Sequence, residues 1–135
     1  MTTPPSPFVL FNLKVTEFLR DLDGLLGDVY DFVIFKQGVQ MISLCDEPRL
    51  AHCFLEYVAT PYRNYICSRD EVFFLDNINK DSIRDVNRDG FDFTILDIIK
   101  GKWCSMTDDD KNAVWAHLEL LVVLCDRCIE SLRRP

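Results

Sequence analysis

The sequence predicts an all-α protein, a single compact bundle of five or six helices with a long C-terminal helix. The strongest observation is the last 29 residues, where Thr107 and Asp110 have the spacing of a capping box. Three aspartates lie in the first turn after Thr107 and two arginines lie at the end, as the helix dipole favours. Apolar residues recur between them at helical spacing, namely Val114, Trp115, Leu118, Leu121, Val122, Cys125, Ile129 and Leu132. Leu120, Val123 and Leu124 add a second apolar face, so the middle of this helix is expected to be nearly surrounded by protein.

The N-terminal segment shows the same helical periodicity. Ser6 is expected to cap a first helix with Pro7 at its first position, and Gly24 and Gly27 are expected to end it. The apolar stripe of this helix is Phe8, Phe11, Val15, Phe18, Leu19 and Leu22, and the opposite face carries Asn12, Lys14, Glu17, Arg20 and Asp21. A second helix is expected from about Asp28 to Leu44.

The middle of the chain predicts shorter helices. Asp46-Glu47-Pro48 is a helix start, and Pro61 is expected to stop that helix because proline has no N–H. Ser68 to Glu71 has the spacing of another capping box and opens a short helix. Residues 77–90 are polar and are expected to form the longest exposed loop. Another helix follows from the spacing of Phe93, Leu96, Ile99 and Trp103.

Length and charge restrict the class of protein. The chain has 135 residues, which suits one helical domain over residues 7–135 after a disordered tail at residues 1–6. The net charge is −7 and no basic stripe appears, so direct binding of nucleic acid is not expected. The longest uncharged apolar run, Leu120 to Cys125, is too short to span a membrane. No cofactor is expected.

Six cysteines are present, and the polar, proline-rich N-terminus does not have the pattern of a signal peptide. The sequence therefore predicts reduced thiols in an intracellular protein. Cys125 and Cys128 have metal or redox spacing, but both lie late in the predicted helix, where the dipole raises a thiol pKa. Buried structural thiols are the favoured interpretation. A zinc site would need two more ligands, such as His117, Cys104, or Cys53 with His52.

One segment has half of a calcium-binding loop. Asp85, Asn87 and Asp89, followed by Gly90, match the first half of the motif, but Leu96 stands where the bidentate glutamate belongs. An acidic turn explains the same residues. A weak calcium-responsive helical module that uses Asp85, Asn87 and Asp89 is therefore the alternative function.

The remaining candidates favour binding over catalysis. His52 and His117 are the only histidines, and neither is near a nucleophile motif, so no enzyme activity is expected. Tyr57, Tyr62 and Tyr65 cluster around Pro61 and are the predicted interface, because tyrosine is a frequent interface anchor. The alternative is a packed helix–helix corner that only holds the fold. Trp103 and Trp115 are expected in the core.

Three stretches carry a resemblance, at residues 11–22, 61–75 and 103–118. Among their shared features are Phe11-Asn12-Leu13-Lys14, Pro61-Tyr62-Arg63-Asn64 and Lys111 to Leu118. With these features the chain resembles an uncharacterised family of short helical proteins encoded by giant (nucleocytoplasmic large) DNA viruses. The resemblance implies a virus-encoded protein in the infected host cell cytoplasm or the virion, and it implies no activity. The expected function is non-enzymatic binding of a viral or host protein partner, or self-association.

Overall fold

The computed structural model describes residues 6–77 and 95–133, and all regular structure in these ranges is helical. The helices are α1 (Pro7–Leu26), α2 (Tyr30–Cys45), α3 (Arg49–Phe54), α4 (Thr60–Cys67), α5 (Glu71–Asn77), α7 (Ile95–Lys102) and α8 (Asp108–Arg133). A π-helical turn, η1 (Leu55–Ala59), joins α3 to α4, and a 3-10 turn, η2 (Trp103–Ser105), precedes α8. The predicted all-α bundle with a long C-terminal helix is confirmed.

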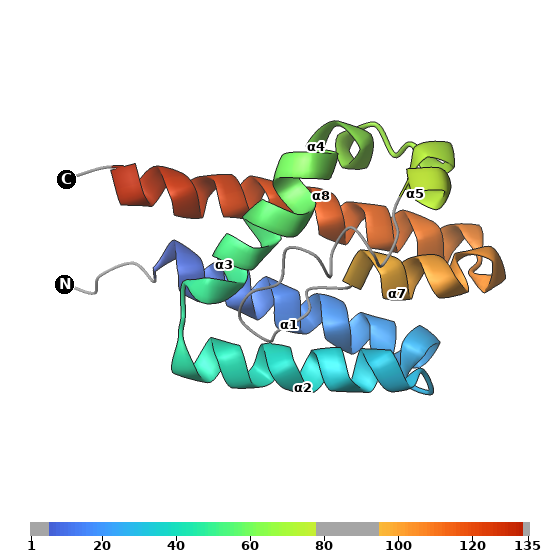
Figure 1. Ribbon diagram of the computed structural model, residues 1–135, viewed down its shortest axis with the longest axis horizontal. Helices are drawn as coiled ribbons and strands as arrows, with labels where there is room; N and C mark the ends of the chain where they lie inside the picture. Colours follow the sequence, from blue (N-terminus) through green and yellow to red (C-terminus); the bar gives the residue numbers. More distant parts are fainter. Residues whose placement is uncertain (1–5, 78–94, 134–135) are drawn as a thin grey trace.

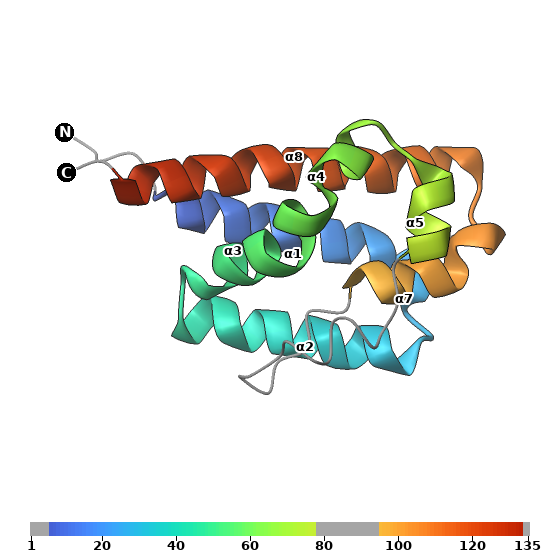
Figure 2. The same ribbon diagram turned by 45° about the horizontal axis from the view of Figure 1, so that its top comes forward.

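The three longest helices lie along the length of the molecule, with α1 between α2 and α8 (Figures 1 and 2). Each runs antiparallel to its neighbour, so α1 begins at the end of the molecule where α8 finishes. The rod formed by α3, η1 and α4 crosses this layer, where α3 contacts α1, α2 and α8 and α4 contacts α8. The buried apolar side chains of all these elements form one core. Its largest fully buried members include Trp103, Phe11, Phe32 and Phe54.

Helix α1 begins as predicted. The N–H of Phe8 donates to Ser6 Oγ at 3.2 Å, so Ser6 is the N-cap. The prediction that Gly24 helps to end the helix is wrong, since α1 continues to Leu26. A Cβ at Gly24 would have no contact within 4 Å, so nothing there requires glycine, whereas a Cβ at Gly27 would lie 2.6 Å from the carbonyl oxygen of Asp23. Only Gly27 therefore marks the end of α1.

Asn12 was expected on the polar face of α1, but its side chain is buried. Its Nδ2 donates to the carbonyl oxygen of Glu47 at 2.9 Å. This bond satisfies a backbone acceptor in the connection between α2 and α3. A polar residue on the expected solvent face therefore fixes the α2–α3 corner against α1.

The prediction that Pro61 stops the third helix is wrong. The rod continues through Pro61 because the turn immediately before it is π-helical, with the Thr60 N–H bonded to the carbonyl oxygen of Leu55. Proline cannot donate a helical bond and clashes with the carbonyl four residues earlier, which is Tyr57. The wider π turn re-routes these bonds and places Pro61 in the first turn of α4, where it is tolerated.

The predicted cap at Ser68 is also wrong. Residues Ser68 and Arg69 end α4 instead of starting α5: Arg69 has a left-handed φ of 53°, and the N–H groups of Arg69 and Asp70 donate to the carbonyls of Ile66 and Tyr65. This is a Schellman motif, formed without the usual glycine. The cap of α5 is Asp70, whose Oδ1 accepts from the Phe73 N–H at 3.0 Å.

Helix α8 has the predicted capping box. The Asp110 N–H donates to Thr107 Oγ1 at 3.1 Å, and the Thr107 N–H donates to Asp110 Oδ2 at 3.3 Å. The prediction that the middle of α8 is nearly surrounded is wrong, because Leu120 and Val123 are 40% and 48% exposed. Since α1, α3, η1 and α4 cover one side of α8, Leu120 and Val123 of its second apolar face reach solvent, whereas Leu124 is buried.

Two guanidinium–carboxylate pairs connect the α4 region to the outer side of α8. Arg63 donates to both carboxylate oxygens of Asp126 at 2.6 and 2.7 Å, which raises the pKa of Arg63. Arg69 donates to Glu119 at 2.8 Å, which likewise raises its pKa. Planar bidentate pairs set orientation, so these contacts fix the position of the rod over α8.

Candidate functional site

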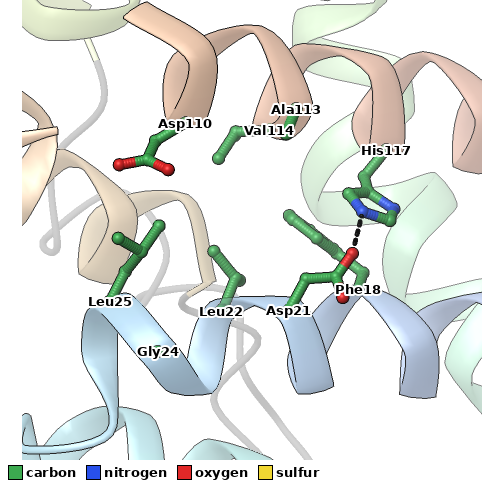
Figure 3. Close-up of a pocket in the computed structure, with 9 residues that line it drawn as sticks. All are labelled: Phe18, Asp21, Leu22, Gly24, Leu25, Asp110, Ala113, Val114 and His117. Atoms are coloured by element: carbon green, nitrogen blue, oxygen red, sulfur yellow. Dashed lines mark hydrogen bonds and ion pairs between the residues drawn. The ribbon is translucent and has the colours of Figure 1, made fainter. Parts of the chain in front are cut away.

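A pocket with a volume of about 370 Å³ lies between the second half of α1 and the first half of α8 (Figure 3). Its lining residues are Phe18, Asp21, Leu22, Gly24, Leu25, Asp110, Ala113, Val114 and His117. The side chains of Phe18, Leu22 and Val114 are buried and provide an apolar wall. Asp21, Asp110 and His117 provide the polar groups. We call this cavity the α1–α8 pocket.

Two residues from opposite sides of the pocket meet. His117 Nε2 lies 2.8 Å from Asp21 Oδ2, which joins α8 to α1 (Figure 3). The imidazole also stacks on the ring of Phe18, with 4.8 Å between ring centroids and an angle of 24°. The His117 side chain is 23% exposed and that of Asp21 is 65% exposed. The ring is therefore held in place on one side while the carboxylate stays open to solvent.

Asp110 supplies a second carboxylate to the α1–α8 pocket. Its Oδ2 accepts from the Thr107 N–H in the capping box, which fixes the orientation of the side chain. A carboxylate has about four acceptor positions, so the cap leaves capacity for a ligand. The first turn of α8 thus positions a negative charge at the opposite end of the pocket from the Asp21–His117 pair (Figure 3).

The chemistry of the α1–α8 pocket favours binding of a cation with an apolar body. Asp21 and Asp110 are acceptors for a positively charged group, and the buried Phe18, Leu22 and Val114 wall suits a hydrocarbon chain. The lining contains no Ser, Thr, Cys or Lys. His117 therefore has no protein nucleophile beside it in this pocket to activate.

The predicted interface residues lie on the α3–η1–α4 rod. Tyr57 is half-buried and packs against the core. Tyr62 is half-buried, which raises its pKa, and its ring packs edge-on against Phe73 with centroids 6.3 Å apart. Tyr65 is 36% exposed, and its ring stacks parallel to that of Phe73. The structure thus brings Tyr62 and Tyr65 together around α5, and their role as an interface stays a prediction.

The thiols of Cys125 and Cys128 are fully buried, as the favoured interpretation predicted. Cys125 Sγ donates to the carbonyl oxygen of Ala51 at 3.5 Å. Burial raises the pKa of Cys125 to about 12 and that of Cys128 to about 11. Thiolates are the reactive and metal-binding form, so both groups are inert at neutral pH. Within residues 6–77 and 95–133, no group of three or more metal-ligating side chains could hold an ion.

We expect alkylation of the folded protein with iodoacetamide at pH 8 to separate the six cysteines into two classes. Cys45, Cys67 and Cys104 are exposed and should react within minutes. The buried thiols, Cys53, Cys125 and Cys128, should react at least about 100-fold more slowly, because they are inaccessible and, for the last two, protonated. Peptide mass spectrometry measures the rates. Fast labelling of Cys125 would contradict the burial of this face of α8.

The same pKa shifts predict that the folded protein loses stability at high pH. The folded state holds the Cys125 and Cys128 protons more tightly than the unfolded chain, whose thiols have a pKa near 9. Their contribution is therefore fully present below about pH 9 and is lost as the pH rises through about 11 to 12.

The remaining predictions from the sequence concern the calcium loop, His52 and membrane spans. Asp85, Asn87 and Asp89, the candidate calcium ligands, lie outside the described residues, as do residues 1–5 of the predicted tail. His52 is on α3 and stacks near Phe8, away from His117. Across residues 6–77 and 95–133, the helices lack the combination of length and apolar character that a bilayer span requires.

Sequence reasoning did not assemble the α1–α8 pocket. The sequence predicts Asp21 on the polar face of a helix and Asp110 in a capping box, and it places His117 near no nucleophile motif. Asp21 and His117 are 96 residues apart, and no local motif connects them. Only the antiparallel packing of α1 against α8 brings these side chains together.

No protein-family model, curated protein or solved structure matches this chain. The resemblance to giant-virus proteins stays a prediction.

Proposed function

We propose that this is a non-enzymatic, protein-binding module whose α1–α8 pocket receives an arginine or lysine side chain of a partner protein. The observation that carries this proposal is the presence of two carboxylates, Asp21 and Asp110, beside a buried apolar wall in one cavity. The resemblance to giant-virus proteins supports a setting in the infected host cell or the virion.

The size and chemistry of the pocket support a single long side chain as the occupant. A volume of about 370 Å³ is near the lower end for small-molecule sites, which span roughly 300–1,000 Å³. Arginine and lysine combine an aliphatic stem with a cationic head, so the stem suits Phe18 and Leu22 while the head suits Asp21. The net charge of −7 favours approach of a basic partner.

A hydrolytic role for the Asp21–His117 pair is the competing interpretation. An Asp–His pair orients an imidazole in many active sites, but it acts there on an adjacent nucleophile or a held water. The pocket lining offers no side-chain nucleophile, and the Asp21 side chain is 65% exposed. Without a nucleophile beside His117, the pocket supports recognition of a cation better than activation of a nucleophile.

We expect a capped Leu-Arg-Leu peptide to bind at the α1–α8 pocket with a dissociation constant of about 0.1–1 mM, as for a single anchoring side chain. Titration of ¹⁵N-labelled protein should shift amide signals of residues 18–25 and 110–117 first. The same peptide with citrulline in place of arginine keeps the shape and removes the charge. It should bind at least about 5-fold more weakly.

The variant Asp21→Asn should weaken binding of the arginine peptide about 5- to 20-fold, because a charge-assisted bond is lost. Asp109→Asn is the matched control, since it removes an equal charge from the first turn of α8 at a residue outside the pocket lining. It should weaken binding less than 2-fold. Equal effects of the two variants would show that only net charge matters, and tight binding of the citrulline peptide would contradict recognition of a cation.

The surface around Tyr62 and Tyr65 offers a second protein-binding site, supported by the exposure of Tyr65. Here Tyr62→Ala is expected to lower the free energy of unfolding by about 1–2 kcal/mol, because the half-buried ring contacts Phe73. Tyr65→Ala should cost less stability and, for an interface role, should reduce capture of partners in a pull-down. Urea denaturation followed by circular dichroism measures both stabilities. A fully stable Tyr62→Ala variant would mean that the ring does not hold α5.

A further inference from the structure

The outer face of α2 carries an exposed apolar stripe. Its members are Tyr30, Ile34, Met41 and Leu44, which are 75%, 47%, 67% and 87% exposed. Gln37 lies on the same stripe and is exposed. The opposite face of the helix already supplies its buried residues to the core, namely Phe32, Phe35 and Val39. Within the described residues, the exposed stripe is therefore separate from the face of α2 that supplies the core.

The spacing of this α2 stripe is that of a helix–helix seam. From Tyr30 to Ile34, Gln37, Met41 and Leu44, the intervals alternate between four and three residues. A repeat of this kind keeps side chains on one side of a helix and is the pattern that packs against a second helix. At 1.5 Å per residue the stripe is about 21 Å long.

Charge distinguishes among the possible occupants. Asp31 and Lys36 are the only charged residues of α2, and neither belongs to the stripe. Lys36 forms an ion pair with Asp23 of α1, on the side that faces the bundle. The stripe is thus neutral on a protein with a net charge of −7. It offers no complement to a basic or acidic partner, whereas two copies of it bring no like charges together.

We infer that the α2 stripe is a self-association surface that pairs with α2 of a second copy of this chain in antiparallel orientation. A two-fold axis at Gln37 places Tyr30 opposite Leu44 of the second copy and Ile34 opposite its Met41. Gln37 then meets itself, and a primary amide can donate to and accept from an identical amide. An isologous contact of this kind closes at two copies.

Antiparallel pairing suits α2 better than parallel pairing. The intervals of the stripe read almost the same in both directions from Gln37, so all four apolar residues find apolar partners. Parallel pairing would align the two helix dipoles unfavourably. One short helix covers less than the roughly 800 Å² per partner of a standard interface, so we expect a dissociation constant on the order of 10–100 μM.

Sedimentation velocity of the full chain, kept reduced, tests this inference over about 1–300 μM. The wild-type protein should change from monomer to dimer across this range. Ile34→Asp should weaken association at least about 10-fold, since it brings a charge into the seam. Val123→Asp is the matched control, because Val123 is 48% exposed on α8 and Ile34 is 47% exposed. It should leave the dimer unchanged.

A mixing experiment tests the antiparallel register. Ile34→Asp and Met41→Lys variants should each be monomeric, but an equimolar mixture should associate, because the antiparallel pair brings Asp at position 34 of one copy to Lys at position 41 of the other. Thermal melts confirm that each variant is folded. A wild-type protein that stays monomeric at 300 μM would overturn the inference, and so would equal effects of Ile34→Asp and Val123→Asp. Failure of the mixture to associate would overturn the register. None of these measurements depends on the α1–α8 pocket.

Discussion

Replacing Trp103 by alanine is expected to lower the free energy of unfolding by about 3–5 kcal/mol, the range for a large aromatic side chain removed from a core. Trp103 is fully buried in η2. Its ring lies 5.0 Å from that of Phe74 and 5.4 Å from that of Trp115, measured between centroids. The indole therefore fills the space where α5, η2 and the first half of α8 meet, and alanine would leave a cavity there.

Urea denaturation followed by circular dichroism at 25 °C measures this loss. Trp103→Phe is the control, because it keeps a ring against Phe74 and Trp115. Among the residues that the structure describes, none accepts a hydrogen bond from the buried indole Nε1 of Trp103, so phenylalanine removes volume without breaking a described hydrogen bond. It should cost about 1–2 kcal/mol. A loss below 1 kcal/mol for Trp103→Ala would show that this aromatic contact is not a central part of the core.

The starts of α1 and α8 could be predicted because their signals are local. Each start is set by residues no more than three apart. Ser6 caps α1 with Pro7 in its first turn, and the capping box of Thr107 and Asp110 caps α8. The apolar stripes were predictable for the same reason, since one helical period decides which face is apolar. Such features need no knowledge of the rest of the chain.

The middle of the chain departs from prediction at two places, where the backbone adopts a conformation that the local sequence does not favour. Pro61 is usually a helix stop, but the π turn before it restores the path of the helix. Arg69 occupies a left-handed conformation that favours glycine, and its side chain bonds to Glu119 on α8. A contact between Arg69 and α8 thus accompanies an unfavourable backbone conformation at Arg69. The sequence around Ser68 gives no sign of this contact.

The candidate site could not be predicted because it depends on which helices are neighbours. Periodicity shows that α1 and α8 each have an apolar face, but it does not show that those faces meet. Once α1 packs antiparallel to α8, Asp21 lies beside His117 and the α1–α8 pocket forms. Exposure has the same origin: Leu120 and Val123 are apolar, and they stay exposed because the rod covers a different side of α8.

The second large effect is expected for Leu121→Ala in α8. Leu121 is 3% exposed and belongs to the single core, so its truncation should lower the free energy of unfolding by about 2–5 kcal/mol. Thr107→Ala should cost about 1 kcal/mol, because it removes the capping bond to the Asp110 N–H. Denaturant midpoints measured with an unchanged slope give both values.

Leu120 provides the matched control for Leu121, since the same substitution falls on the next residue of the same helix. Leu120 is 40% exposed, so Leu120→Ala should change stability by no more than about 0.5–1 kcal/mol. Helix propensity is the same for both variants and cancels in the comparison, which leaves burial as the difference. Similar losses for the two leucines would mean that α8 is covered on both sides, as its apolar pattern alone suggests. A large loss at Leu121 only would establish the one-sided packing of α8 that also positions Asp110 and His117 in the α1–α8 pocket.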